Sequence, residues 1–203
     1  VVFHSIIEEE RGRFTMGDVV DGVAQKMVYR HPHVFGTVQA DTSDQVLTNW
    51  EVLKRAEKGQ NTTADAVEAV PHTLPALWRA EKIQAKAEKA GFEWPNVQAA
   101  MDKLTEELEE LQTAVADHSN VEEELGDLLF SAVNVSRFLH IDAEQALTAS
   151  TDKFIRRFAR VEELAKSREI DLAAASLEEM DALWDEAKRL EPREESTPLG
   201  YKK

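Results

Sequence analysis

Residues 103–130, KLTEELEELQTAVADHSNVEEELGDLLF, carry two acidic clusters on what the pattern predicts to be two consecutive helices. In the first of these, leucine and valine recur at helical spacing, which predicts an amphipathic helix with one buried stripe. Glu107 and Glu110 lie one turn apart on a flank of that stripe. Glu106 and Glu109 are expected to point further out.

The second predicted helix is apolar or small on nearly every side, which is typical of a helix buried all round. Glu124 and Asp127 nevertheless lie at its head, one turn apart on one face, and Ser131 and Asn134 continue that face. Burying an ionised carboxylate costs several kcal/mol unless the group is paired or coordinates a metal.

Local cations are too few to neutralise these acids. Between residues 102 and 127 there are ten Asp and Glu residues, and the only Lys or Arg is Lys103. A charge run such as EELEE is ordinarily a solvated helix surface, and for the first cluster taken alone that interpretation is favoured over a metal site. The pairing with ELGDLLF, where carboxylates enter an apolar helix, favours a divalent metal ion instead.

The ligand types indicate which metal. Two pairs of carboxylates spaced i,i+3 across a helical hairpin would give an all-oxygen site, and hard oxygen ligands suit Mg²⁺, with Mn²⁺ as the alternative. Zinc prefers nitrogen and sulfur, and a di-iron bundle needs a histidine where Asp127 stands. Because Mg²⁺ usually shares its shell with substrate phosphates, the site points to a phosphate-bearing substrate.

The remainder of the sequence predicts an all-α fold, since glycines, prolines and few β-branched alternations leave little room for a sheet. The net charge of −15 disfavours binding to nucleic acid or to an anionic membrane. The sequence shows neither a membrane-length apolar run nor a signal-peptide pattern, and it has no cysteine. We therefore expect a cytoplasmic protein with no nucleic-acid and no membrane partner.

An internal repeat organises the chain. Residues 14–31 parallel residues 141–158, so that Lys26 matches Lys153 and Arg30 matches Arg157. The chain begins inside an apolar helix without a methionine, which we interpret as a truncated first repeat. The expected organisation is a remnant of that repeat with a following helix (1–58), a linker (59–72), a C-terminal catalytic domain (73–191) and a flexible tail (192–203).

Capping signals set the expected helices. Ser43 would cap a helix over 43–58, Asp142 one running to about residue 168, and Ser176 with Glu179 forms a capping box for a helix over 176–190. A helix from residue 74 is expected to end at Gly91, and the first acidic helix covers 97–116.

Basic and aromatic residues supply candidate partners for phosphate. Lys153 and Arg157 lie on one helix face and could together bind a polyphosphate, although pairing with Asp152 or Glu162 is the competing interpretation. Trp184 would either stack on a base or pack in the core. Further side chains are interpreted as a solvated basic face (Arg79, Lys82, Lys86) or as core and rim aromatics (Trp78, Phe92, Trp94).

Several segments of the sequence resemble those of a known family. The segments KLTEELEEL, EEELGDLLF and DKFIRRF are similar to the C-terminal domain of MazG-type nucleoside triphosphate pyrophosphohydrolases. RHPHVFG, LPALWRAEKIQ and GFEW resemble the interdomain and lead-in segments, so the resemblance spans nearly the whole chain. It implies a helical bundle with a four-helix-type core, completed by homodimerisation. It also implies Mg²⁺-dependent hydrolysis of NTPs or dNTPs to the monophosphate and pyrophosphate.

The resemblance also implies roles for individual residues. The Mg²⁺ ligands would be Glu107, Glu110, Glu124 and Asp127. The nucleotide-binding residues would be Lys103, Asp127, Lys153, Arg156, Arg157 and Trp184, with residues 120–123 facing the nucleotide. Glu106 or Glu123, neighbours of the ligands, are the candidates for the catalytic base. The alternative function is a non-catalytic helical module that dimerises with or regulates a partner.

Overall fold

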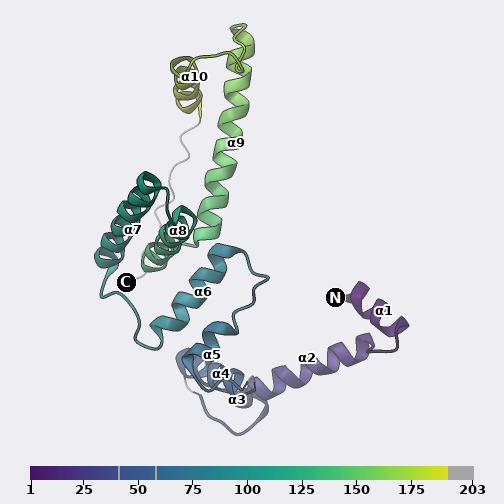
Figure 1. Ribbon diagram of the computed structural model, residues 1–203. Coiled ribbons are helices and arrows are strands. Elements are labelled where there is room, and N and C mark those ends of the chain that lie inside the picture. The colour runs from purple at the N-terminus through teal and green to yellow at the C-terminus, as the bar shows by residue number, and fades with distance from the viewer. Residues whose placement is uncertain (41, 58, 192–203) are drawn as a thin grey trace. The chain divides into compact units, whose positions relative to one another are not determined.

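The computed structural model describes residues 1–40, 42–57 and 59–191, and every regular element within those ranges is a helix (Figure 1). This confirms the all-α prediction. The chain forms two compact units, which we call unit 1 (Val1–His72 with Lys82–Glu93) and unit 2 (Thr73–Glu81 with Trp94–Lys203). The predicted tail at 192–203 lies outside the described residues. None of the helices described is long and apolar enough to span a bilayer.

Unit 1 is built around α2, which contacts its neighbours α1, α3 and α4. The helices of this unit are α1 (Val2–Glu10), α2 (Met16–Arg30), α3 (Pro32–Phe35), α4 (Ser43–Glu57), α5 (Thr63–Glu68) and the second part of α6 (Ala76–Glu88). The chain changes direction between α2 and α3 because Pro32 has no backbone N–H with which to continue the first helix.

Helix α5 lies inside the segment that the sequence predicted to be a linker. Thr62 accepts a hydrogen bond from the Asp65 backbone N–H at 3.0 Å, and the Thr62 N–H donates to the Asp65 carboxylate at 2.7 Å. This reciprocal pair is a capping box with Asp in the third position. The helix is only six residues long, so its apolar periodicity was too short to detect.

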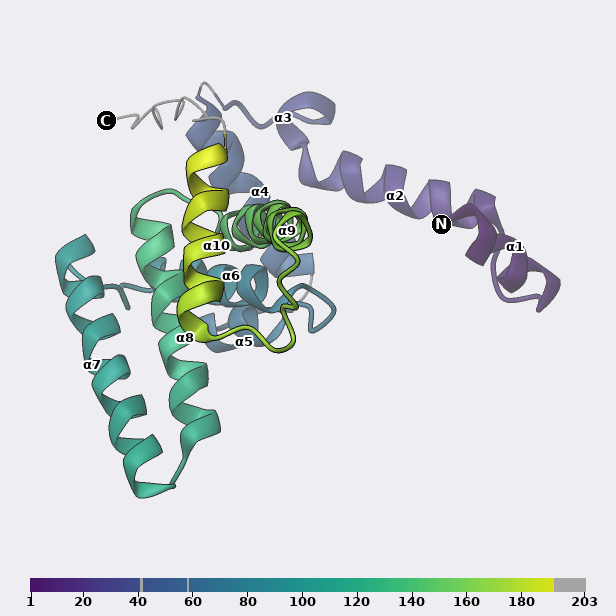
Figure 2. The same cartoon turned by 90° about the horizontal axis from the view of Figure 1, so that it is seen from above.

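Unit 2 holds the acidic hairpin. Helix α7 (Val97–Asp117) and helix α8 (Val121–Phe138) lie side by side and run antiparallel, as Figures 1 and 2 both show. A three-residue turn joins them, and two of its residues, His118 and Asn120, have φ of +52° and +51°. That left-handed conformation lets the chain reverse within a few residues. The turn thereby brings the acidic faces of the two helices together.

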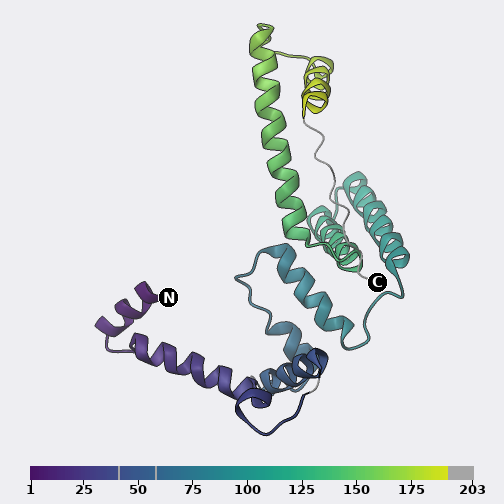
Figure 3. The ribbon, with the colours of Figure 1, turned by 180° about the vertical axis from the view of Figure 1, so that it is seen from behind.

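The second half of unit 2 is a hairpin of α9 (Ala143–Ser167) and α10 (Leu177–Leu190), seen from behind in Figure 3. Two of the caps expected from the sequence are present, Asp142 on α9 and the Ser176–Glu179 box on α10. The expected Ser43 cap is wrong, because Ser43 is already inside α4 and the Thr42 hydroxyl accepts from the Gln45 N–H at 3.3 Å. Val161 and Ala165 pack against Leu183 and Ala187, because each pair lies one helical turn apart on its own helix. These four side chains form a buried core between α9 and α10.

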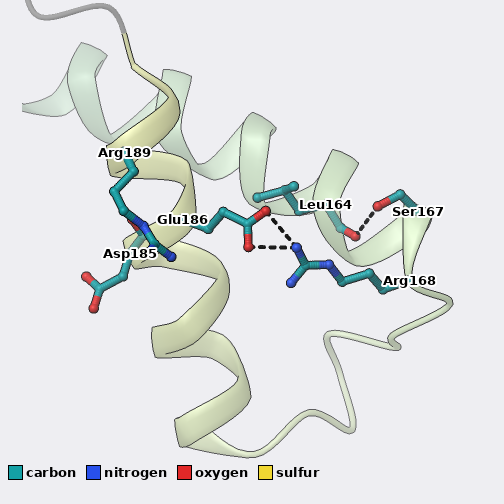
Figure 4. A network of polar contacts seen from close by, with 6 residues as sticks. All are labelled: Leu164, Ser167, Arg168, Asp185, Glu186 and Arg189. Carbon is teal, nitrogen blue, oxygen red and sulfur yellow. Dashed lines mark hydrogen bonds and ion pairs between the residues drawn. The ribbon is translucent and has the colours of Figure 1, made fainter.

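An ion pair joins the C-terminal end of α9 to α10. The Arg168 guanidinium, just past the end of α9, donates to both oxygens of Glu186 on α10 at 2.6 Å (Figure 4). Beside it, the Ser167 hydroxyl donates to the Leu164 carbonyl at 2.7 Å and satisfies one of the last carbonyls of α9. The Arg168–Glu186 pair is partly exposed, so it fixes the pairing of the two helices more than it adds stability.

Two sequence interpretations are wrong. Helix α8 is not buried all round, since Leu125, Leu129 and Phe130 are exposed in the single chain. Its apolar composition indicates contact surface on several sides, and within one chain only part of that surface is covered. Phe92 is neither core nor rim, because 83% of it is exposed.

Candidate metal centre

Three carboxylates converge between α7 and α8. One oxygen from each of Glu107, Glu124 and Asp127 lies within 4.8 Å of the other two. Glu124 and Asp127 share a face of α8 because they are one turn apart, and the antiparallel pairing of the hairpin brings Glu107 of α7 opposite them. Only 6% of Glu107 is exposed, Glu124 is half-buried and Asp127 is exposed. The three therefore form a centre with a buried floor and an open side.

Lys103 partly neutralises the buried end of this centre. Its ammonium lies 2.9 Å from Glu107 and 2.8 Å from Glu106, both on the same helix. Hydrogen bonds to Glu106 and Glu107 raise the pKa of Lys103. Within the described residues, Glu124 and Asp127 make no ion pair. The centre therefore keeps excess negative charge and an all-oxygen donor set, which fits a hard divalent cation such as Mg²⁺ or Mn²⁺.

Glu110, predicted as the fourth ligand, is not one of the three grouped carboxylates. It is exposed, one turn beyond Glu107 on α7. Desolvation and the nearby Glu107 carboxylate raise its pKa, while the charge of Lys103 opposes that shift. Glu110 therefore lies within the field of the centre, and its ligand role stays a prediction.

The two candidate bases lie beside the centre. Glu106 is exposed and paired with Lys103, and Glu123 is exposed in the first turn of α8. Each is the immediate neighbour of a grouped carboxylate, so its own side chain starts about 100° around the helix from that group. Their catalytic roles stay predictions.

The predicted phosphate-binding residues lie on α9. Lys153 and Arg156 are exposed, and in the described part of the chain neither makes an ion pair. Arg157 is half-buried, and its Nε and Nη2 both lie 2.8 Å from Oε2 of Glu191. The sequence offered Asp152 or Glu162 as the competing partners, whereas the structure provides a residue beyond the end of α10.

Trp184 on α10 combines the two interpretations that the sequence left open. It is half-buried and packs against the core between α9 and α10. Its ring centre lies 5.2 Å from that of Phe154 and 6.0 Å from the Arg157 guanidinium. Core packing is therefore established for part of the ring, and contact with a nucleotide stays a prediction.

Comparison with known proteins decides the family. The model of the MazG nucleotide pyrophosphohydrolase domain matches residues 1–35 and 96–161. A nucleoside triphosphate pyrophosphohydrolase of Escherichia coli K12 is 40% identical over 195 residues, which cover 94% of this chain and 74% of that protein. The chain belongs to the MazG nucleotide pyrophosphohydrolase family.

Other relatives extend the comparison. A nucleoside triphosphate pyrophosphohydrolase/pyrophosphatase MazG of Thermotoga maritima is 43% identical over 188 residues, or 93% of this chain and 71% of that protein. The uncharacterized protein YabN of Bacillus subtilis is 46% identical over 196 residues, or 95% of this chain and 40% of its own length. The two stretches that match the MazG model contain residues 14–31 and 141–158 respectively, the two copies of the predicted repeat.

Two polar residues continue the face of α8 that carries Glu124 and Asp127. Ser131 is buried, and the buried Oδ1 atom of Asn134 has no hydrogen-bond partner within residues 1–40, 42–57 and 59–191. A buried acceptor left unpaired costs about 1–3 kcal/mol. The sequence indicated the polar line that leads from Asp127 to Asn134, but it could not show that the amide oxygen would lack a donor.

Proposed function

We propose that this protein is a divalent-metal-dependent nucleoside triphosphate pyrophosphohydrolase that converts NTPs or dNTPs to the monophosphate and pyrophosphate. The observation that carries the proposal is the convergence of Glu107, Glu124 and Asp127 in a chain of the MazG family. Two of the relatives reported above are named for this activity. Because the substrates are cellular nucleotides, we infer a cytoplasmic location.

Mg²⁺, or Mn²⁺ in its place, would be held by the three grouped carboxylates, with Glu110 as a fourth ligand. The geometry supports this because Glu107 is buried and, within the part of the chain that the structure describes, its charge is balanced by Lys103, which it shares with Glu106. When bound there, such ions neutralise a triphosphate and lower the pKa of a coordinated water.

The chain's own groups would bind and orient the nucleotide. Lys153 and Arg156 offer exposed charges to the phosphates. Arg157 directs Nε and Nη2 to Glu191, which leaves its other guanidinium nitrogen, Nη1, available for a phosphate oxygen. Lys103 would face the nucleotide from α7, and the exposed part of Trp184 would contact it.

The proposed reaction is an in-line displacement. The oxygen of a water forms a bond to the α-phosphorus, the bond from that phosphorus to the bridging oxygen breaks, and pyrophosphate leaves. The proton of the water passes to a carboxylate, either Glu106 or Glu123. Both are exposed beside the centre and can return that proton to solvent.

We also infer that the protein is a homodimer. Large apolar side chains are exposed on one helix of the acidic hairpin and on α9, namely Leu125, Leu129, Phe130, Phe154 and Phe158. Scattered exposed apolar residues are normal, but several on adjoining helices indicate an interaction surface. Light scattering after gel filtration should give a dimer mass for the wild type and a shift toward monomer for Leu129→Asn. A monomeric wild type would contradict the inference.

The test of the proposed function is Mg²⁺-dependent pyrophosphate release from a panel of all NTPs and dNTPs. Glu107→Gln should lower the rate by more than about a hundredfold, the upper end of the loss caused by changes around metal ligands. Glu109→Gln, on the exposed side of the same helix, makes the same charge change and should retain the wild-type rate. A wild-type rate in Glu107→Gln would refute the ligand assignment. No release from any nucleotide with Mg²⁺ or Mn²⁺ would refute the enzyme.

A further inference from the structure

Unit 1 contains a pocket of about 270 Å³ that is lined from α4, α5 and the second part of α6. Its lining is unusually basic for a chain with a net charge of −15. Five cationic side chains line it, namely Lys54, Arg55, Lys82, Lys86 and Lys89, and the lining includes one carboxylate, Glu51. The sequence predicts a solvated face of Arg79, Lys82 and Lys86; Lys82 is exposed as predicted, whereas Arg79 and Lys86 are half-buried. Lys82 and Lys86 line the pocket together with cations from other segments.

Helical spacing explains why the cations converge. Lys82 and Lys86 lie one turn apart on α6, and Lys89 follows one turn later, just beyond the end of the helix. Lys54 and Arg55 occupy the last turn of α4. The small side chain of Ala66 on α5 is buried and contributes an apolar group to the same lining.

Lys54 and Lys89 are among the cations that neighbouring side chains hold in place. The Lys54 ammonium lies 4.5 Å from the centre of the Trp50 ring, and Lys89 forms an ion pair with Glu51. Arg55 also acts on Asp65, but that carboxylate has a lowered pKa chiefly because it accepts hydrogen bonds from Thr62 in the cap of α5. With five cationic side chains and one carboxylate in its lining, the pocket has a formal excess of positive charge.

Like charges gathered on neighbouring helical turns are destabilising by themselves, so an anion in the pocket would stabilise the arrangement. Lysine and arginine bind phosphate, and the uncharged side chains of Gln60 and Thr63 add further hydrogen-bonding groups to the lining. The volume lies just below the range of about 300–1,000 Å³ typical of pockets for drug-sized ligands. It suits a short phosphate chain better than a whole nucleotide.

We propose that this pocket of unit 1 is a binding site for a small polyphosphate anion of the class of inorganic pyrophosphate. The assignment depends only on the geometry of unit 1, so it stands independently of the proposed reaction. If that reaction is correct, its product belongs to the class of anion that the pocket binds.

The test is calorimetric titration of the full chain with sodium pyrophosphate in a chelating buffer free of divalent cations. Without metal, the acidic centre repels the anion, and comparison of a pocket variant with a control variant distinguishes the basic pocket from the basic residues of α9. We expect the wild type to bind pyrophosphate more tightly than orthophosphate, with an affinity that falls as salt rises. The Lys82→Gln/Lys86→Gln variant should bind at least about tenfold more weakly.

The matched control is Lys166→Gln/Lys188→Gln, which removes the same charge from exposed positions on α9 and α10. It should retain the wild-type affinity, and circular dichroism should show that both double variants fold. If the first double variant fails to fold, Lys82→Gln alone replaces it, with a smaller expected loss. Equal weakening in both double variants, or no binding by the wild type, would overturn the proposal. Titration with ADP tests whether the pocket binds a nucleotide instead of a bare phosphate chain. If ADP binds more tightly than pyrophosphate, the assignment to a bare phosphate chain is overturned.

Discussion

The pair α2 and α4 in unit 1 and the pair α9 and α10 in unit 2 contain the same polar arrangement. In unit 1, Arg30 donates from Nε to Glu57 at 2.7 Å, and its guanidinium lies 5.4 Å from the Trp50 ring centre. In unit 2, Arg157 donates from Nε to Glu191 at 2.8 Å and lies 6.0 Å from Trp184.

The two helix pairs differ in what accompanies this arrangement. In the described residues, the only group of three carboxylates close enough to hold a metal ion is in unit 2. The arginine, tryptophan and glutamate therefore belong to the packing of both helix pairs, whether or not a metal centre is present. The chemistry specific to unit 2 comes from α7 and α8. Arg157 and Trp184 accordingly have a structural role in addition to any contact with a nucleotide.

The largest effect should come from the feature that the two units do not share. Asp127→Asn removes one charged ligand from the centre and should lower pyrophosphate release by more than about a hundredfold while leaving the helical content unchanged. Asp117→Asn, at the exposed end of α7, is the matched control and should behave as the wild type. Equal activity of the two variants would show that Asp127 is not a metal ligand.

An intermediate effect should come from the shared feature. Arg30→Gln and Arg157→Gln each break a partly buried ion pair, and each should destabilise the fold by about 1.5–3 kcal/mol, the value typical of hydrogen bonds to charged groups. Urea unfolding followed by circular dichroism measures this loss. Only Arg157→Gln should also slow pyrophosphate release. Full stability in both variants would show that the repeated arrangement does not support the packing.

Local spacing in the sequence predicted much of the site. The i,i+3 pair of Glu124 and Asp127, with Glu107 on the preceding helix, indicated the carboxylates that the structure brings together. The capping residues Asp142 and Ser176 likewise predicted the starts of α9 and α10 within one residue. These features depend on neighbours within a turn or two, for which helical periodicity is sufficient.

Features that depend on distant parts of the chain were not predictable in this way. The partner of Arg157 lies 34 residues away, so the sequence favoured nearer acids. The apolar pattern of α8 indicated contact surface but not which surface would be covered within one chain. The basic pocket needs side chains from three helices, and each lysine taken alone is an ordinary surface residue.

The smallest effect concerns Glu110, which lies near the negative charge of the centre but is not one of its three grouped carboxylates. Its pKa is raised above 4.5 in the folded chain, so the folded state binds its proton more tightly than the unfolded state does. The stabilisation that comes from protonated Glu110 is therefore present at pH below 4.5, and it is lost as the pH rises through the raised pKa.

Thermal unfolding of metal-free protein across this pH range measures the effect. Glu110→Gln should equal the wild type below pH 4.5 and should have a slightly higher Tm at neutral pH, where Glu109→Gln, further from the centre, should show a smaller change. A neutral-pH Tm lower than that of the wild type would mean that ionised Glu110 is stabilised in the fold, contrary to the direction of its pKa shift.

The most direct test of the central claim is calorimetric titration of the full chain with Mn²⁺ and Mg²⁺ in the presence of an NTP analogue that has a methylene group between the α- and β-phosphorus. We expect saturable metal uptake by the wild type and by the Asp117→Asn control. Uptake should be lost in Glu107→Gln/Glu124→Gln/Asp127→Asn, with helical content retained. Equal uptake by the triple variant, or none by the wild type, would contradict the assignment of these three carboxylates as a metal centre.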